Sequence, residues 1–220
     1  MSKAPRILAL ATGNAHKLQE FSEILAPTGW EVKSLKAWLP TIPEPEETEP
    51  DFPGNALLKA KFALAKLREA GVVNLPDALA ADDSGLAVDA LGGAPGVVSA
   101  RYAELACTGS GDAANRAELI RNLSGKGGAN DRFDAAFVCA IAFLEPSSGR
   151  FLTVHGKCHG QVGLVERGEG GFGYDSLFHP KLPDGSISEA TFAQMPSEAK
   201  HGLSHRGNAL QNLLAALSES

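Results

Sequence analysis

Apolar positions along the first half of the chain alternate between short continuous runs and helical spacing, which predicts an α/β fold. Residues 6–11 are typical of a buried strand, and a turn at 12–14 leads into a helix over 16–26 whose apolar residues follow the helical period. A second short strand is expected at 31–35. Five prolines between residues 40 and 53 then exclude regular structure, so we expect an acidic loop there.

The middle of the chain continues this alternation. A helix rich in Ala, Leu and Lys is expected after Gly54-Asn55, to about residue 70, and a short strand at 79–81 leads into Asp82. Residues 112–123 are typical of another helix. Helices and strands therefore alternate in this part of the chain, as they do in α/β proteins.

The last part of the chain is richer in strands. The apolar run at 133–144, a turn at 145–149 and a return strand at 150–155 predict a hairpin. A further strand is expected at 158–165, and residues 204–217 are typical of an amphipathic helix with Ser204 as its N-cap. We therefore expect a mixed sheet flanked by helices.

Composition favours one domain over residues 1–220, with two lobes. The chain has 220 residues, 44% of them hydrophobic and 21% charged, which is typical of a globular protein with one sizeable core. The run Ile7–Ala11 is too short for the core of a signal peptide, and no stretch approaches the roughly 20 apolar residues that span a bilayer. Three distant cysteines fit reduced thiols. We expect a cytoplasmic protein without a membrane segment.

Charge narrows the class of ligand. The formal net charge is -6, which disfavours the broad positive surface that nucleic acid polymers require. A polyanionic ligand would need a local cluster of basic groups. Free nucleotides are therefore better candidate ligands than polymers.

The first candidate site is the run Thr12-Gly13-Asn14-Ala15-His16-Lys17, where a strand is predicted to lead into a helix. Backbone amides and the positive end of the helix point into one space at such a junction, and Lys17 lies one turn inside the helix. A phosphate would be bound well there. A tight turn with Asn14 capping the helix explains the same residues equally well.

Paired carboxylates form the second candidate. Asp82 and Asp83 follow an apolar strand, so we expect both at a strand end, where α/β proteins build sites from loops. Adjacent carboxylates raise each other's pKa, and a divalent cation between them offsets that cost. A solvated turn is the alternative. The proline-rich loop carries five carboxylates: Glu44, Glu46, Glu47, Glu49 and Asp51. One of the five could complete a metal shell, and we expect most of them to be solvated.

Two further runs carry groups suited to a nucleotide base. The glycines of Gly171-Phe172-Gly173-Tyr174-Asp175 disfavour a strand or a helix, and a flexible backbone lets an aromatic ring lie against a flat ligand. Lys200, His205 and Arg206 surround a predicted helix start, where Arg206 could contact a purine oxygen or a phosphate. A glycine-rich hairpin and an ordinary helix cap are the structural alternatives.

With their flanks, these motifs resemble the inosine triphosphate pyrophosphatase family, the RdgB-like pyrophosphatases of non-canonical purine nucleoside triphosphates. The resemblance runs essentially from end to end. The matching motifs are Thr12-Gly13-Asn14-x-x-Lys17, Asn55-Ala56-x-x-Lys59-Ala60, Ala81-Asp82-Asp83-Ser84-Gly85-Leu86, the run from Gly92 to Tyr102, Phe172-Gly173-Tyr174-Asp175 and Ser204-His205-Arg206-Gly207.

The resemblance implies hydrolysis of XTP, ITP and dITP to the monophosphate and pyrophosphate, with Mg²⁺ required and a homodimer as the usual assembly. It also implies an elongated mixed sheet, with the active site in a cleft between two lobes. Asp83 would be the catalytic residue, and the metal ligands would be Glu47, or its neighbour Glu46, with Asp82 or Asp83. The substrate would be bound by Thr12, Gly13, Asn14, Ala15, His16, Lys17, Lys59, Ser84, Phe172, Gly173, Tyr174, Asp175, Lys200, His205 and Arg206.

Two other functions stay open. A pyrophosphatase of similar fold acting on pyrimidine or modified nucleotides would differ only in its base contacts. A nucleotide sensor without enzymatic activity would need the pocket but not the Asp82-Asp83 pair, so this pair favours an enzyme.

Overall fold

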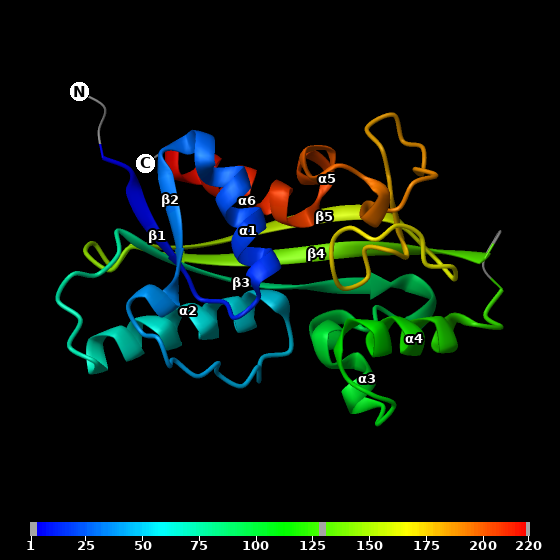
Figure 1. Cartoon of the computed structure of the whole chain (residues 1–220), viewed down its shortest axis with the longest axis horizontal. Helices are drawn as coiled ribbons and strands as arrows, with labels where there is room; N and C mark the ends of the chain where they lie inside the picture. Colours follow the sequence, from blue (N-terminus) through cyan, green and yellow to red (C-terminus); the bar gives the residue numbers. More distant parts are fainter. Residues whose placement is uncertain (1–3, 128–130, 219–220) are drawn as a thin grey trace. The chain divides into compact units, whose positions relative to one another are not determined.

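The structure, a computed structural model, describes residues 4–127 and 131–218 and has an α/β fold (Figure 1). Strands and helices alternate along the first half of the chain, as the sequence predicts. The strands are β1 Arg6–Leu10, β2 Trp30–Ser34, β3 Ala78–Val88, β4 Arg132–Leu144, β5 Phe151–Gly163 and β6 Phe178–Pro180. The α-helices are α1 Ala15–Leu25, α2 Phe52–Glu69, α3 Tyr102–Leu105, α4 Gly111–Leu123, α5 Ser197–Leu203 and α6 His205–Ser218.

The strands form one mixed sheet in the order β2-β1-β3-β4-β5-β6. Strand β1 pairs in parallel with β2 and with β3, whereas β5 and β6 are antiparallel. The prediction of a mixed sheet flanked by helices is confirmed. No helix within the described residues is long and apolar enough to cross a membrane.

The chain forms two compact units. Unit 1 consists of Met1–Asp83, Cys139–His155 and Ala209–Ser220, and unit 2 consists of Ser84–Val138 and Gly156–Asn208. Strands β3, β4 and β5 and helix α6 each contribute residues to both units. The division within β3 falls between Asp83 and Ser84.

In unit 1, the alternation of side chains along the strands places helices on both faces. On β3, Ala78 and Ala80 belong to a cluster with residues of α1 and α6, whereas Leu79 and Ala81 pack with residues of α2. Figure 1 shows α1 and α2 on opposite sides of β3. This arrangement follows from the two-residue period of a strand, and it fixes which helix each β3 side chain faces.

In unit 2, aromatic rings form the centre of the core. The rings of Phe137 and Phe178 have centroids 4.6 Å apart, and Phe178 lies 5.2 Å from Phe192. Leu119 and Leu123 of α4 belong to the same cluster. Burying such side chains contributes about 1.5–3 kcal/mol each, so this cluster holds α4 against the strands of unit 2.

Strand β3 is longer than the sequence predicts, and this corrects the expected position of the Asp82-Asp83 pair. The pair lies inside the strand instead of at its end, because pairing continues through Ser84 and Gly85 to Val88. A side chain at Gly85 would collide with the Gly96 carbonyl oxygen and the Ser99 hydroxyl. The glycine therefore permits close approach within a strand and does not mark a turn.

Two other predicted boundaries are wrong. The two strands expected at 150–155 and 158–165 form one continuous strand, β5, from Phe151 to Gly163. Helix α2 begins at Phe52, inside the expected loop, because Asp51 caps it through the Gly54 amide at 2.8 Å and Pro53 lies in the first turn, where its missing N–H has no cost. The expected cap at Ser204 is confirmed, since its hydroxyl accepts from the Gly207 amide at 3.0 Å.

Candidate active site

The turn between β1 and α1 is built by two short side chains. Asn14 Oδ1 accepts from the amides of His16 at 2.9 Å and Lys17 at 3.2 Å, and Thr12 Oγ1 accepts from the Asn14 amide at 3.1 Å. The capped turn foreseen as one explanation of this run is therefore present. The helix start also directs Lys17 toward β3, where its Nζ lies 3.0 Å from Asp82 Oδ2.

Another amide of this turn bonds to the acidic loop. The Gly13 amide donates to Glu44 Oε1 at 2.9 Å. The Glu44 carboxylate lies so close to Gly13 that a β-carbon there would collide with it. A negatively charged oxygen therefore occupies the position where the sequence predicts a phosphate oxygen.

Asp82 and Asp83 point to opposite faces of β3. Asp82 forms an ion pair with Lys17 of α1, and Asp83 Oδ1 lies 2.8 Å from Lys59 Nζ of α2. This follows the alternation of the strand, since Ala80 also faces α1 and Ala81 faces α2. Both carboxylates are buried. The two adjacent residues thus belong to two separate polar clusters.

The cluster on the α2 face gathers four polar groups. Lys59 Nζ lies 2.5 Å from Glu47 Oε1 as well as 2.8 Å from Asp83, and it also donates to the Asp82 carbonyl oxygen at 3.4 Å. Asn55 Nδ2 donates to Asp83 Oδ2 at 3.4 Å and is itself almost fully buried. Glu47 is therefore the acidic-loop residue whose carboxylate joins this cluster, whereas Glu49 bonds Asn55 through its backbone. We name this group the Lys59 cluster (Glu47, Asn55, Lys59 and Asp83).

Burial and charge act against each other in the Lys59 cluster. Burial raises the pKa of Asp83 above its ordinary value, although Lys59 offsets part of this rise, and the nearby Glu47 carboxylate adds to it. Burial alone would lower the pKa of Lys59, but Asp83 and Glu47 together outweigh it and raise that pKa. Asp83 is thus a carboxylate with raised basicity, which suits a group that accepts a proton.

The Lys59 cluster is also where a hard cation could be held. Within the described part of the chain no three His, Cys, Asp or Glu side chains form a metal-binding group. Glu47 and Asp83, however, direct two carboxylate oxygens at one point, the Lys59 ammonium. Mg²⁺ is commonly bound by one or two carboxylates together with substrate phosphates, so this donor set fits it.

The third run, 171–175, forms a turn in unit 2. Asp175 Oδ2 accepts from the Phe172 amide at 2.9 Å and from Lys200 Nζ at 2.8 Å. Tyr174 is buried and donates to the Ser99 carbonyl oxygen at 2.8 Å. The Tyr174 side chain therefore anchors the turn, whereas the partly exposed Phe172 ring lies at the surface of the unit.

The fourth run places cations around that ring. Lys200 Nζ lies 5.2 Å and the Arg206 guanidinium 5.8 Å from the centre of the Phe172 ring. Arg206 also donates to Ser84 Oγ at 2.9 Å. The His205 ring stacks on Phe137 with centroids 4.7 Å apart, so it packs against the core of unit 2. One aromatic face and two cations thus converge with Asp175.

Comparison with known proteins identifies the family. The sequence pattern of the Ham1 family matches residues 8–216. The chain belongs to the Ham1 family. This chain is 44% identical to a curated relative, the dITP/XTP pyrophosphatase of Exiguobacterium sibiricum, over 96% of both chains. It is 42% identical to the dITP/XTP pyrophosphatase of Desulforamulus reducens, over 96% of this chain and 95% of the relative.

Solved structures of Ham1 proteins share the fold. A HAM1 protein from Coxiella burnetii has a TM-score of 0.75 at 31% identity, covering 98% of this chain and all of that one. A nucleoside-triphosphatase described as a dITP/XTP pyrophosphatase from Mycobacterium abscessus has a TM-score of 0.67 at 38% identity, covering 96% and 99%. The resemblance noted from the motifs is therefore confirmed.

Sequence reasoning missed several residues that the structure places at the candidate site. Asn55 lies in one of the matching motifs, but nothing in that motif predicts its hydrogen bond to Asp83, the candidate general base. Ser99, Asp112 and Arg116 hold the 171–175 turn through its backbone or through Tyr174. Among the expected substrate residues, Ala15 and His16 are exposed at the start of α1. The roles assigned to the expected site residues stay predictions.

Proposed function

We propose that this protein hydrolyses dITP, ITP and XTP to the corresponding monophosphate and pyrophosphate. The observation that carries the proposal is the Lys59 cluster, in which a buried carboxylate of raised pKa lies beside a lysine and a second carboxylate. Relatives with 42–44% identity over nearly the whole chain are named dITP/XTP pyrophosphatases, which supports this substrate class.

The residues of unit 1 suit the triphosphate. Lys17 and Lys59 each have an ammonium group beside a buried carboxylate of β3, and each can turn part of its charge to phosphate oxygens. The Gly13 amide, which bonds Glu44 in this structure, can donate to a phosphate in its place. We therefore assign the phosphates to the β1–α1 turn and the two lysines.

Mg²⁺ would be held by Glu47 and Asp83, the carboxylates that meet at Lys59. When bound, it supplies positive charge that neutralises phosphate oxygens during hydrolysis. Asp82 faces the other side of β3 and pairs with Lys17, so we assign Asp82 to positioning that lysine. Of the metal ligands considered from sequence, Glu47 and Asp83 are thus the two that we propose.

The chemistry proposed for Asp83 is proton removal from a water molecule. The water oxygen attacks the α-phosphorus in line, the bond between that phosphorus and the bridging oxygen to the β-phosphorus breaks, and the water proton passes to Asp83. Lys59 and Lys17 offset the charge that develops on the departing pyrophosphate.

The residues of unit 2 suit the purine base. The Phe172 ring offers a flat apolar face, and Lys200 and Arg206 are donors that suit the 6-oxo oxygen of hypoxanthine or xanthine. The 6-amino group of adenine would present a donor to these donors, and an unmatched buried polar group costs affinity. This predicts that ATP is rejected.

The decisive experiment is a measurement of pyrophosphate release from dITP, ITP, XTP, ATP, GTP, dTTP and UTP, with Mg²⁺ and with excess chelator. We expect release from dITP, ITP and XTP, little from ATP and the pyrimidine nucleotides, and loss of release with the chelator. A preference for a pyrimidine nucleotide would refute the proposed substrate class. Nucleotide binding without pyrophosphate release from any member would refute the enzymatic function.

Three expectations from the sequence stay predictions. The homodimer is tested by light scattering on the purified protein. The cytoplasmic location is tested by cell fractionation. The single domain with a cleft between two lobes is tested by a crystal structure with a bound nucleotide.

A further inference from the structure

Gly173 has both of its backbone polar groups bound by side chains of α4. Its amide donates to Asp112 Oδ2 at 2.7 Å, and its carbonyl oxygen accepts from Arg116 Nη1 at 3.0 Å. Asp112 and Arg116 lie four residues apart, so they project from one face of the helix. Gly173 has φ +59, a left-handed conformation that glycine adopts without steric cost. The two side chains thus restrain the backbone at the residue of this turn that has the widest conformational freedom.

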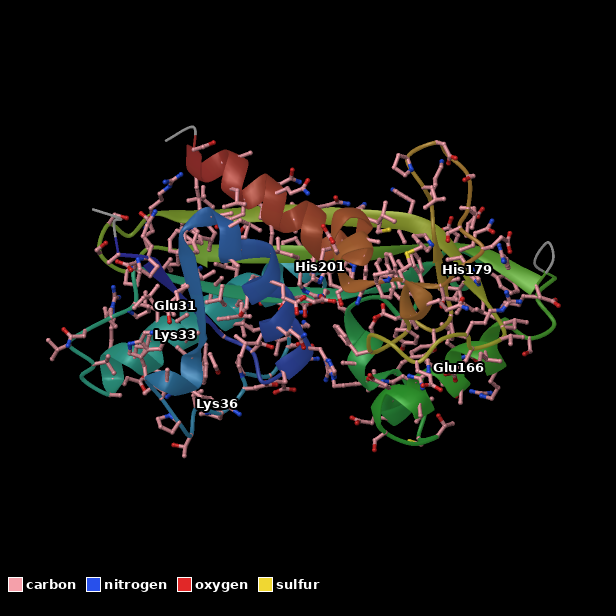
Figure 2. The ribbon with its side chains drawn as sticks, turned by 45° about the horizontal axis from the view of Figure 1, so that its top comes forward. Glu31, Lys33, Lys36, Glu166, His179 and His201 are labelled. Atoms are coloured by element: carbon pink, nitrogen blue, oxygen red, sulfur yellow. The ribbon has the colours of Figure 1, made fainter. Side chains whose placement is uncertain are left out.

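The Arg116 side chain is itself held in place. Its Nε donates to Glu166 Oε2 at 2.8 Å, and Glu166 accepts from Ser176 Oγ at 3.1 Å. Figure 2 shows Glu166 beside α4 and the segment that carries the turn. Arg116 therefore joins two points of the 171–176 segment, the Gly173 carbonyl and, through Glu166, the Ser176 hydroxyl.

Core packing does not account for Asp112. The residue is exposed in the first turn of α4, whereas the core contacts of this helix come from Leu119 and Leu123. Hydrogen bonds to ionised groups are stronger than neutral ones, and both bonds to Gly173 are of this kind. Both side chains bond the backbone of Gly173, which lies between Phe172 and Tyr174.

We propose that Asp112 and Arg116 are positioning residues for base recognition, acting through the backbone of Gly173. The proposal rests on the function proposed for Phe172 and Asp175. Rotation of the peptide units at Gly173 would move the Phe172 ring away from Lys200 and Arg206, which lie 5.2 and 5.8 Å from its centre. Loss of the two α4 side chains would therefore weaken base binding and leave the phosphate chemistry of unit 1 intact.

The test compares kinetic constants for dITP in Asp112→Ala, Asp112→Asn and Arg116→Lys. Loss of a hydrogen bond to a charged group predicts that KM rises about tenfold in Asp112→Ala while kcat stays nearly constant. Asparagine retains an acceptor oxygen, so Asp112→Asn should recover most of this loss. Lysine lacks the planar fork that reaches two acceptors, so Arg116→Lys should raise KM despite its retained charge.

Arg121→Ala is the matched control. Arg121 lies on the same helix and pairs with Glu118, away from the turn, so its loss removes an arginine and an ion pair without touching Gly173. We expect its KM to match that of the wild type. A KM rise in Arg121→Ala as large as in Asp112→Ala would assign the effect to the helix as a whole and overturn the proposal.

Binding measurements separate the two ends of the substrate. Calorimetric titration should show weaker binding of IMP by Asp112→Ala and unchanged binding of pyrophosphate. In a Phe172→Ala background, Asp112→Ala should add little, because the side chain that it positions is gone. Equal KM in wild type and in Asp112→Ala and Arg116→Lys would overturn the proposal, and additive losses would do the same. A wild-type protein that releases no pyrophosphate from dITP would instead refute the proposed function.

Discussion

In unit 1 the candidate site residues hold one another through their side chains. In unit 2 the candidate base-binding turn has a similar pair, Lys200 with Asp175, but it is also held by residues to which no role in the site is assigned. Lys59 contacts Glu47 and Asp83 directly, at 2.5 and 2.8 Å, and all three are candidate site residues. The turn at 171–175 is anchored by Ser99, Asp112 and Arg116, for which the motifs give no role.

This difference separates two ways of building a site. A cluster of opposite charges is disrupted by the loss of any member, because the remaining charges stay buried without compensation. A turn anchored through its backbone can lose an anchor and still present its side chains, at a lower precision. Substitutions in unit 1 should therefore affect the reaction step, and those around the turn should affect mainly the affinity for the base.

The sharpest test of the comparison is Asp83→Asn. Removal of the proposed general base should lower kcat for dITP on the order of a thousandfold. The fold should persist, because asparagine has nearly the same volume and can still accept from Lys59 Nζ. Stopped assays for pyrophosphate measure the rate, and the melting temperature serves as the control. A near-normal rate would show that Asp83 is not the base.

A paired substitution compares one lysine from each unit. Lys59→Met should lower kcat roughly a hundredfold, because it removes charge beside the reacting phosphate. Lys200→Met should instead raise KM about tenfold through the loss of a charged hydrogen bond to Asp175, with a smaller effect on kcat. Steady-state kinetics with dITP measure both. The same split between kcat and KM in both variants would break the proposed division between the units.

A stability measurement addresses the support of α4. Thr108, Arg121 and Asn122 donate to the buried Glu118 carboxylate, and Arg121 above all lowers the pKa of Glu118 to about 2 from an ordinary value of 4.5. The stabilisation is therefore present above pH 4.5 and is lost as the pH falls toward 2. We expect Glu118→Gln to lower the melting temperature by a few degrees at neutral pH.

The pH dependence of the melting temperature distinguishes the loss of the ionised Glu118 carboxylate from a simple packing defect. Melting curves of the wild type and Glu118→Gln should converge as the pH falls through the interval between 4.5 and about 2. A difference that stays constant across this interval would show that the ionised carboxylate is not the stabilising form.

The smallest expected effect concerns the acidic loop. Glu44→Gln removes the negative charge beside the Gly13 amide, which weakens the bond that a phosphate must replace. We expect KM for dITP to fall roughly two- to threefold, because charged hydrogen bonds exceed neutral ones by a modest amount. Glu49→Gln, with the same charge change in the same loop, is the control. An unchanged or raised KM in Glu44→Gln would show that the carboxylate does not compete with substrate.

Much of the fold follows from local patterns. The β1–turn–α1 opening, the helix at α4 and the Ser204 cap were predicted closely, because apolar periodicity and capping residues act over a few neighbours. The extent of β3 was not, since Gly85 is explained only by Gly96 and Ser99, which come later in the chain. Likewise, Gly160 allows close approach of β6 and does not interrupt β5.

The candidate site shows the same limit. Charged motif residues such as Lys59 and Asp83 could be selected from sequence because their chemistry is explicit. Asp82 and Asp83 lie within strand β3, so their side chains point to opposite faces. This separation can be predicted only once the extent of the strand is known. The anchoring of Gly173 by Asp112 and Arg116 could not be predicted, because 61 residues separate Gly173 from Asp112 and a backbone acceptor or donor leaves no mark in the sequence.

The Glu44 carboxylate is tethered to the same chain as the amide that it contacts. A tethered group acts at an effective concentration that is set by the length and stiffness of its linker. Free anions that offer a single contact, such as inorganic phosphate, compete with that effective concentration. In the proposed binding mode a triphosphate would overcome this competition, because it would contact the Gly13 amide and both lysines at once. We therefore expect the Glu44 carboxylate to disfavour single phosphates more than triphosphates as ligands of this turn.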